Sequence, residues 1–307
     1  MSDILKDIQK KLPKIINSAH FEGANIVLYT DDLEFFKDNQ GKIKELVNEF
    51  KKRIELRADP SLLKTPEETE KIIKEVVPVE AELTNILFDP QRSIVVIEAK
   101  RPGLVIGKSG LILKEIKDKC FWIPQIQRSP AIKSKITENI REVLYQNNST
   151  RKKFLNAVGK KIYKEWNPEK IEEWIRVTVL GAGRQVGRSC FLLQTPQTKV
   201  LLDCGVDVAG KGKDKFPYLD APEFKLNELD AIILTHAHLD HCGLLPYLFK
   251  MGYRGPIYMT APTRDIAALL ALDYVGVAYK QATAPLYKAE DIKEMVRHSI
   301  VLNYGEV

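Results

Sequence analysis

The chain has 307 residues, which is enough for two or three domains with cores of their own. Its composition, 44% hydrophobic and 29% charged, fits a globular protein, and no apolar run is long enough for a membrane helix, so we expect no membrane partner. The four cysteines are scattered and form no C-x-x-C pair. Reduced thiols of this kind are typical of a cytoplasmic protein.

The positive charge is concentrated in the middle of the sequence. Residues 1–80 carry 14 basic and 16 acidic side chains, residues 81–170 carry 18 and 9, and residues 171–307 carry 15 and 16. The excess of basic side chains in the middle segment is where a polyanion would bind. A solvated helical face of like charge is the alternative interpretation.

The first block, residues 1–78, begins with an amphipathic helix. A strand is expected at residues 25–29, helical patterning at 42–50 and another strand at 53–57. A further helix should begin after Thr65, because Thr65 suits the N-cap, Pro66 suits the first helical position and acidic residues follow.

The second block, residues 79–148, predicts two short strands at 83–88 and 93–98, followed by a glycine-flanked loop at 101–110. A helix at 111–119, a strand at 121–127 and a helix near 132–146 should complete it. A basic helical segment at residues 151–165 leads to Asn167-Pro168, where a domain boundary is expected, so residues 149–173 are assigned to a basic connector.

The third block, residues 174–307, alternates strands with helices, which indicates a layered α/β domain. The expected strands are 175–180, 190–194, 199–202, 231–234, 256–259 and 299–302, and the expected helices are 244–250, 263–279 and 289–298. The strand at 231–234 is entirely apolar and leads directly into a group of histidines.

Four potential metal ligands lie within six residues: His236, His238, Asp240 and His241. Imidazole nitrogens and a carboxylate suit zinc. His236 and His238 should point the same way in an extended loop and hold one ion, while Asp240 and His241 would face a second. Two zinc ions can deprotonate a bridging water and bind both the attacking and the leaving oxygen. The alternative, ordinary surface histidines, is disfavoured because three of the five histidines cluster here.

The third block resembles the metallo-β-lactamase fold, in particular its RNA-processing branch with a β-CASP insertion. The similarity rests on residues 179–190 (VLGAGRQVGRSC), residues 201–205 (LLDCG) and residues 234–243 (LTHAHLDHCG). The resemblance implies that Asp203 supports the metal loop without binding the ion. It also implies that Asp240 orients the zinc-bound hydroxide that attacks phosphorus.

The glycines near Gly181 also permit a dinucleotide-binding interpretation. Three residues rather than two separate Gly183 from Gly187, and a strand rather than a helix should follow. Both features disfavour a nucleotide-binding βαβ unit.

Gly107-Lys108-Ser109-Gly110 follows an apolar stretch and opens a helix. This pattern resembles the G-x-x-G loop of KH domains, which clamps about four nucleotides of single-stranded RNA. The nearby basic residues Arg101, Lys114 and Lys117 would add contacts to phosphate. A helix-initiating turn explains the two glycines alone equally well. The first block resembles a second KH-like unit, but Asp38-Asn39-Gln40-Gly41 stands where its glycine loop would be, which puts RNA contact by that unit in doubt.

Two KH-like units followed by this hydrolase domain resemble the archaeal relatives of the cleavage and polyadenylation specificity factor nuclease. The expected fold is an α/β multidomain chain with KH-like α+β domains at 1–78 and 79–148, a connector at 149–173 and the N-terminal half of a metallo-β-lactamase αββα sandwich at 174–307, without the β-CASP insertion. The resemblance implies zinc-dependent cleavage of single-stranded RNA, with roles in RNA 3′-end processing and transcription termination, and contact with the transcription machinery.

The family's site also uses metal ligands from later motifs. We therefore expect these 307 residues to bind RNA but to cleave it poorly, and to expose an apolar sheet face. The alternative is a non-catalytic RNA-binding subunit completed by a separate C-terminal nuclease chain. A small-molecule hydrolase of the same fold is disfavoured by the RNA-binding character of the N-terminal part.

Overall fold

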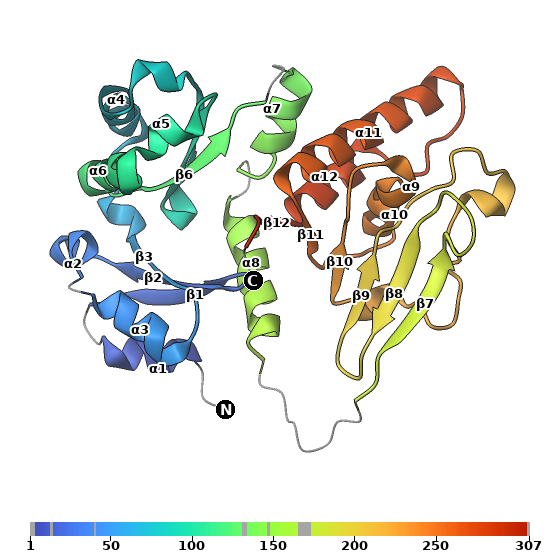
Figure 1. The fold of residues 1–307 in the computed structure, drawn as a ribbon, viewed down its shortest axis with the longest axis horizontal. Helices are drawn as coiled ribbons and strands as arrows, with labels where there is room; N and C mark the ends of the chain where they lie inside the picture. The colour runs from blue at the N-terminus through green and yellow to red at the C-terminus, as the bar shows by residue number, and fades with distance from the viewer. Residues whose placement is uncertain are drawn as a thin grey trace. The chain divides into compact units, whose positions relative to one another are not determined.

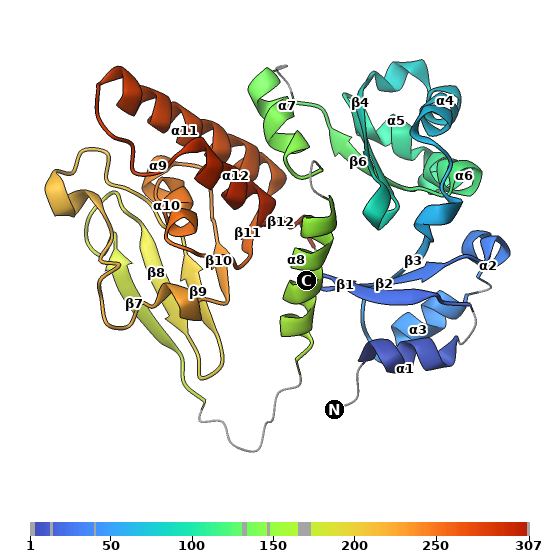
Figure 2. The ribbon, with the colours of Figure 1, turned by 180° about the vertical axis from the view of Figure 1, so that it is seen from behind.

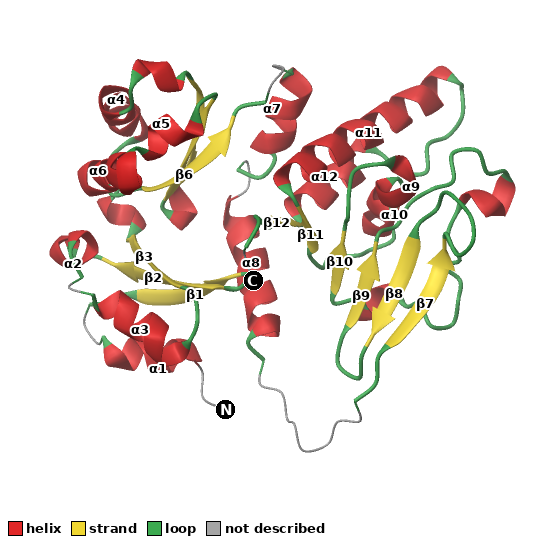
Figure 3. Cartoon of the chain, viewed as in Figure 1, coloured by secondary structure: helices red, strands yellow, loops and turns green. Residues whose placement is uncertain are grey.

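The computed structural model describes residues 4–12, 15–39, 41–130, 134–145, 148–164 and 173–305. Two compact units make up the chain: residues 1–134 with 145–165, and residues 135–144 with 166–307. Both units mix helices with strands, as Figure 3 shows, and the expected α/β multidomain class is confirmed. Among the described residues, no helix has the length and apolar character needed to cross a membrane.

The first unit contains the element order α-β-β-α-α-β twice (Figure 1). The first module comprises α1 (Ile4–Lys11), β1 (Ser18–Glu22), β2 (Asn25–Thr30), α2 (Leu33–Lys37), α3 (Lys42–Phe50) and β3 (Ile54–Ala58). The second module comprises α4 (Pro66–Val76), β4 (Leu83–Asp89), β5 (Ile94–Ala99), α5 (Pro102–Ile106), α6 (Leu111–Cys120) and β6 (Ile123–Arg128). In each sheet the first two strands are antiparallel and the third pairs in parallel with the second. The predicted pair of KH-like α+β modules is confirmed.

Local sequence signals account for the predicted elements of the first unit, whereas short elements without such signals were missed. The Thr65 hydroxyl accepts a hydrogen bond of 3.3 Å from the Glu68 amide, which confirms the predicted helix cap. Strand β1 and the short helices α2 and α5 were not predicted. Helix α5 is a single turn of five residues that contains Gly103 and ends at Gly107, so it carries almost no periodic pattern.

Helix α8 (Asn148–Ile162) packs against the first module. The Gly23 amide donates a hydrogen bond of 3.0 Å to the Leu155 carbonyl, and the Tyr163 hydroxyl donates one of 2.5 Å to the Ala24 carbonyl. A Cβ at Gly159 would collide with Phe21, so only glycine permits this approach. Much of the segment expected as a connector is thus part of the first unit, and residues 165–172 lie outside the described residues.

The second unit contains a six-stranded sheet in the order β12-β11-β10-β9-β8-β7. Its strands are β7 (Arg176–Gly181), β8 (Cys190–Gln194), β9 (Lys199–Leu202), β10 (Ala231–Ile233), β11 (Ile257–Met259) and β12 (Ser299–Val301). Strands β7, β8 and β9 are antiparallel, and β9 to β12 are parallel. Because β7 leads through a loop into an antiparallel strand, the dinucleotide-binding alternative at Gly181 is excluded.

Helices cover one face of this sheet, as Figures 1 and 2 show from opposite sides. They are α9 (Leu239–Cys242), α10 (Leu245–Lys250), α11 (Ala261–Lys280) and α12 (Ala289–Arg297), and α7 (Lys135–Glu142) packs against α11. The side chains of Leu192, Leu201 and Ile232 are fully buried beneath them. Apolar side chains elsewhere on the sheet are exposed, including Val177 and Val179, so the expected exposed apolar surface is present.

Candidate metal centre and glycine loop

The histidine loop begins where the parallel strands β9 and β10 end at the same edge of the sheet. Leu202 of β9 is the partner of Ile233 of β10, so the residues that follow the two strands lie close together. The Asp203 carboxylate accepts hydrogen bonds from the Thr235 amide at 2.8 Å and from the Thr235 hydroxyl at 2.9 and 3.0 Å. Asp203 is 4% exposed and therefore anchors the start of the loop from within the domain.

The same carboxylate orients one of the candidate ligands. His241 Nδ1 lies 2.7 Å from Asp203 Oδ2, and the carboxylate can only accept there, so Nδ1 carries the proton. The Nε2 lone pair of His241 is then available to a metal ion. Metal-binding histidines commonly donate their other ring N–H to a carboxylate in this way.

The donor atoms form two pairs with spacings that suit zinc. His236 Nε2 and His238 Nδ1 lie 3.1 Å apart. Two ligands at ~2.0–2.1 Å from a tetrahedral ion would be about 3.3 Å apart. His241 Nε2 lies 3.6 Å from Asp240 Oδ2, which is also compatible with two bonds to one ion. Each pair can therefore supply half of a tetrahedral ligand set.

In the part of the chain that the structure describes, no three His, Cys, Asp or Glu side chains are gathered to hold a metal ion. A tetrahedral zinc ion takes four ligands, so each pair requires further donors from water, substrate or other protein residues. The residues present therefore fit zinc chemically, but they do not close either coordination sphere.

Backbone contacts hold the loop at two further points that sequence reasoning did not single out. The Ser189 amide donates a hydrogen bond of 2.7 Å to the Asp240 carbonyl, and the Cys204 amide donates one of 2.8 Å to the His241 carbonyl. A Cβ at Gly205 would overlap the Asp240 backbone, so glycine is required there. The glycine of the LLDCG motif was the feature of the sequence that indicated this close backbone contact.

The glycine loop, Gly107–Gly110, connects α5 to α6 on the surface of the second module. Gly107 has a φ of 73° and Gly110 a φ of 77°, which favour glycine at both positions. Lys108 and Ser109 between them are exposed. Three apolar side chains beside the loop are also exposed: Leu104 at 39%, Ile106 at 39% and Leu111 at 63%.

The structure separates the three basic residues expected beside this loop. Arg101 and Lys114 are exposed on the second module. Lys117 instead lies over the Phe36 ring of the first module, with its Nζ 4.4 Å from the ring centroid, and burial lowers the pKa of its ammonium group. Lys117 therefore contributes to the contact between the modules.

The corresponding loop of the first module, residues 38–41, connects α2 to α3. Gly41 has a φ of 78° and precedes α3, as Gly110 precedes α6. Asp38, at the other end, is extended with a φ of −137°, whereas Gly107 has a positive φ. The first module thus keeps one of the two glycines, and Gln40 lies outside the described residues.

Two family models match separate parts of the chain. Residues 1–63 match the model described as the KH domain of transcription termination factor FttA, and residues 183–252 match the metallo-β-lactamase superfamily. A solved Cronobacter sakazakii metallo-β-lactamase with a HARLDQ motif covers 31% of this chain and 34% of its own, at 25% identity and a TM-score of 0.25. That score is too low to support an inference.

Curated relatives match over the whole chain. The transcription termination factors FttA of Methanosarcina mazei and Methanothermobacter thermautotrophicus are each 46% identical over 100% of this chain, which covers 49% and 48% of their lengths. FttA of Pyrococcus horikoshii is 47% identical over 100% of the chain and is 48% covered. The chain spans about half the length of these relatives, and it belongs to their family, which combines KH and metallo-β-lactamase domains.

Proposed function

We propose that the chain binds single-stranded RNA through the glycine loop of its second module and contributes to a zinc-dependent ribonuclease. The observation that carries this proposal is the Gly107–Gly110 turn at the start of α6, in which Lys108 and Ser109 are exposed. The curated relatives are named transcription termination factors, which supports a role in transcription termination. A part in RNA 3′-end processing and contact with the transcription machinery belong to the same proposal.

The glycine loop has the chemistry that single-stranded RNA requires. Glycines at both ends allow a phosphate backbone to approach closely, and the amides at the start of α6 favour an anion. Lys108 adds a positive charge at the turn, and Arg101 and Lys114 are exposed on the same module. The apolar side chains of Leu104, Ile106 and Leu111 offer a surface against which bases can pack.

In the metal centre, His236 and His238 would hold one zinc ion, and Asp240 and His241 the other. Bound zinc would supply an activated water and stabilise charge on the scissile phosphate. Asp240 would orient the attacking oxygen, and Asp203 would keep His241 Nε2 directed at the metal.

Because the donors form two open pairs, we propose that these 307 residues alone cleave RNA poorly. Additional donors would have to complete both coordination spheres. The same observation favours a second candidate function, a non-catalytic RNA-binding subunit whose site is completed by a separate nuclease chain. Zinc-dependent cleavage at full rate by these residues alone would contradict both.

The double substitution Lys108→Asp with Ser109→Asp tests the RNA proposal. Two carboxylates in the loop would repel phosphate, so we expect the affinity for single-stranded RNA to fall about tenfold or more at moderate salt. Fluorescence anisotropy of a labelled RNA gives the affinity, and thermal unfolding checks that the variant is folded.

Lys71→Asp with Gln281→Asp is the matched control, because both residues are exposed away from the loop and the total charge changes equally. The control should retain wild-type affinity. Equal affinities for RNA among all three proteins would refute binding at the glycine loop.

A further inference from the structure

Helix α8 brings basic side chains next to the turn between α3 and β3. The Lys52 Nζ lies 5.3 Å from the centroid of the Tyr163 ring, so the turn and the end of the helix are in contact. The basic residues of this turn and of the end of the helix, which we call the basic patch, are Lys51, Lys52, Arg53, Lys160, Lys161 and Lys164. All of them are exposed.

The acidic residues that flank this turn in sequence are engaged with other partners. Glu49 pairs with Lys11 at 2.8 Å, and Glu55 pairs with the buried Arg57 at 2.9 Å. Lys11 and Arg57 therefore neutralise much of the negative charge of these two carboxylates, which leaves less of it to offset the basic side chains of the turn. The basic patch keeps a strong local positive charge on a module whose sequence is slightly acidic overall.

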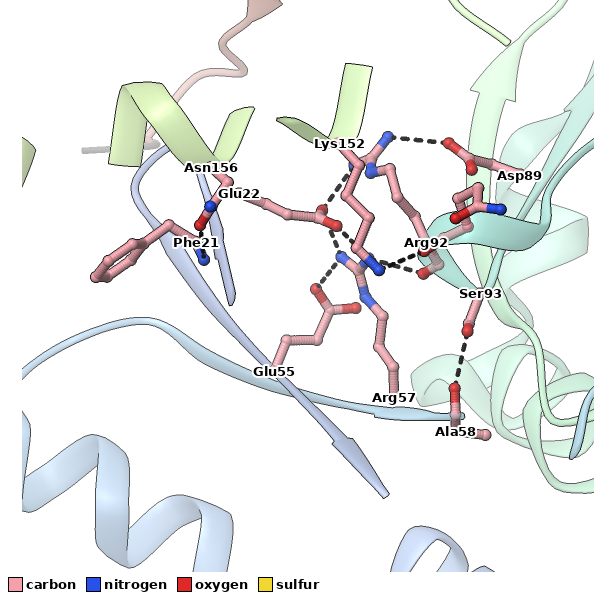
Figure 4. Close-up of polar contacts among 11 residues, drawn as sticks. Phe21, Glu22, Glu55, Arg57, Ala58, Asp89, Arg92, Ser93, Lys152 and Asn156 are labelled. Carbon is pink, nitrogen blue, oxygen red and sulfur yellow. Dashed lines mark hydrogen bonds and ion pairs between the residues drawn. The ribbon is translucent and has the colours of Figure 1, made fainter. Parts of the chain in front are cut away.

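A buried ion cluster joins this part of the first module to the second module (Figure 4). The Arg57 guanidinium donates hydrogen bonds of 2.8 and 2.9 Å to the two carboxylate oxygens of Glu22, and one of 2.8 Å to the Arg92 carbonyl. Arg92, in the turn after β4, donates a bond of 2.8 Å to the same Glu22. Arg57 is 1% exposed, so these contacts are shielded from water.

Helix α8 is tied to the same junction. The Lys152 Nζ donates a hydrogen bond of 2.7 Å to the Gln91 carbonyl and lies 4.5 Å from the centroid of the Tyr29 ring. The Phe21 amide donates a bond of 3.1 Å to the Asn156 side chain, as Figure 4 also shows. Both modules and α8 therefore meet at one junction around the buried ion cluster, and the basic patch and the glycine loop belong to a single compact unit.

We propose that the basic patch is a second RNA-contact surface, which binds the phosphate backbone of single-stranded RNA beyond the stretch held at the glycine loop. The inference rests on the proposed RNA-binding function. Lysines act here as point charges, so the contact is independent of base sequence and weakens with salt. It gives the first module, which lacks a complete glycine loop, a direct part in binding.

The test uses the whole chain with Lys51→Gln, Lys160→Gln and Lys164→Gln combined. Two RNAs are compared: one about four nucleotides long, the length that one KH domain clamps, and one about five times longer. We expect the affinity for the longer RNA to fall about tenfold and its salt dependence to become shallower. Affinity for the short RNA should stay unchanged.

Lys71→Gln, Lys280→Gln and Lys293→Gln form the control, since they remove three exposed charges from helices that do not adjoin the patch. Wild-type affinity for the longer RNA in the patch variant, or an equal loss in the control, would overturn the proposal. The proposal would also be overturned if the patch variant bound RNA normally but no longer bound polyglutamate. That result would indicate that the patch binds an acidic protein segment. Failure of the wild-type chain to bind the short RNA would instead contradict the glycine-loop proposal.

Discussion

Replacing Arg57 by methionine is expected to lower the free energy of unfolding by about 3–5 kcal/mol. The guanidinium neutralises Glu22, which is 4% exposed in its side chain, and it also bonds to the Arg92 carbonyl of the second module. Methionine fills part of the volume but leaves the buried Glu22 carboxylate with only the ion pair to Arg92 among the described residues. Denaturant unfolding at neutral pH measures the loss.

The fall in the free energy of unfolding at acid pH provides an independent measure of the same ion cluster. Burial alone would raise the pKa of Glu22, but the charges of Arg92 and Arg57 outweigh it and lower the pKa from 4.5 to about 2. A depressed pKa gives stability that is present above pH 4.5 and is lost as the pH falls towards 2. This corresponds to about 3 kcal/mol in the wild type and to less in the variant. Burial raises the pKa of Asp89, whose contribution has the opposite sign and offsets part of this loss.

Arg53→Met is the control for this prediction. Arg53 is exposed near the start of β3, so its replacement should change stability by no more than about 0.5 kcal/mol. If Arg57→Met unfolded at the wild-type denaturant concentration, the cluster would not hold the two modules together. The same conclusion would follow if Arg57→Met lost stability at acid pH to the same extent as the wild type.

Replacing His238 by alanine is expected to weaken zinc binding at least about tenfold. His238 Nδ1 and His236 Nε2, which lie 3.1 Å apart, are the two proposed ligands of one zinc ion. Removal of Nδ1 leaves a single imidazole, which cannot chelate. Competition between the chain and a chromophoric zinc chelator gives the affinity.

Asp203→Asn tests the residue that orients His241, without removing a proposed metal ligand. It keeps every proposed donor but weakens the acceptor that orients His241, so we expect a loss of about 10- to 100-fold at the second pair. His298→Ala is the matched control, because His298 follows α12 and contacts Phe249 rather than the cluster. Zinc affinity that is equal in His238→Ala and in His298→Ala would exclude the cluster as a metal site.

Much of the fold was predictable because the sequence carries local signals for it. The Thr65 cap, the apolar strand before the histidines and the helix after Gly110 all depend on residues close together in sequence. The THAHLDH spacing likewise placed His236 and His238 side by side through the alternation of an extended loop. Signals of this kind require no knowledge of tertiary contacts.

The remaining features depend on contacts between residues far apart in sequence. Lys117 was expected beside the glycine loop, but its side chain packs on Phe36 of the other module. Glu22 and Arg92 are separated by 70 residues, and a single sequence gives no sign that they form an ion pair. The helix expected near 132–146 is represented by α7, which belongs to the second unit because Arg141 pairs with Asp265 at 3.0 Å.

The central claim, that single-stranded RNA is held at the glycine loop, is tested most directly by ultraviolet crosslinking of the wild-type chain to RNA and identification of the crosslinked peptides. The account predicts crosslinks in the segment that includes Gly107–Gly110 and α6 (Leu111–Cys120), with further crosslinks near α8 only for longer RNA. Crosslinks confined to the second unit, with none in either module, would contradict it.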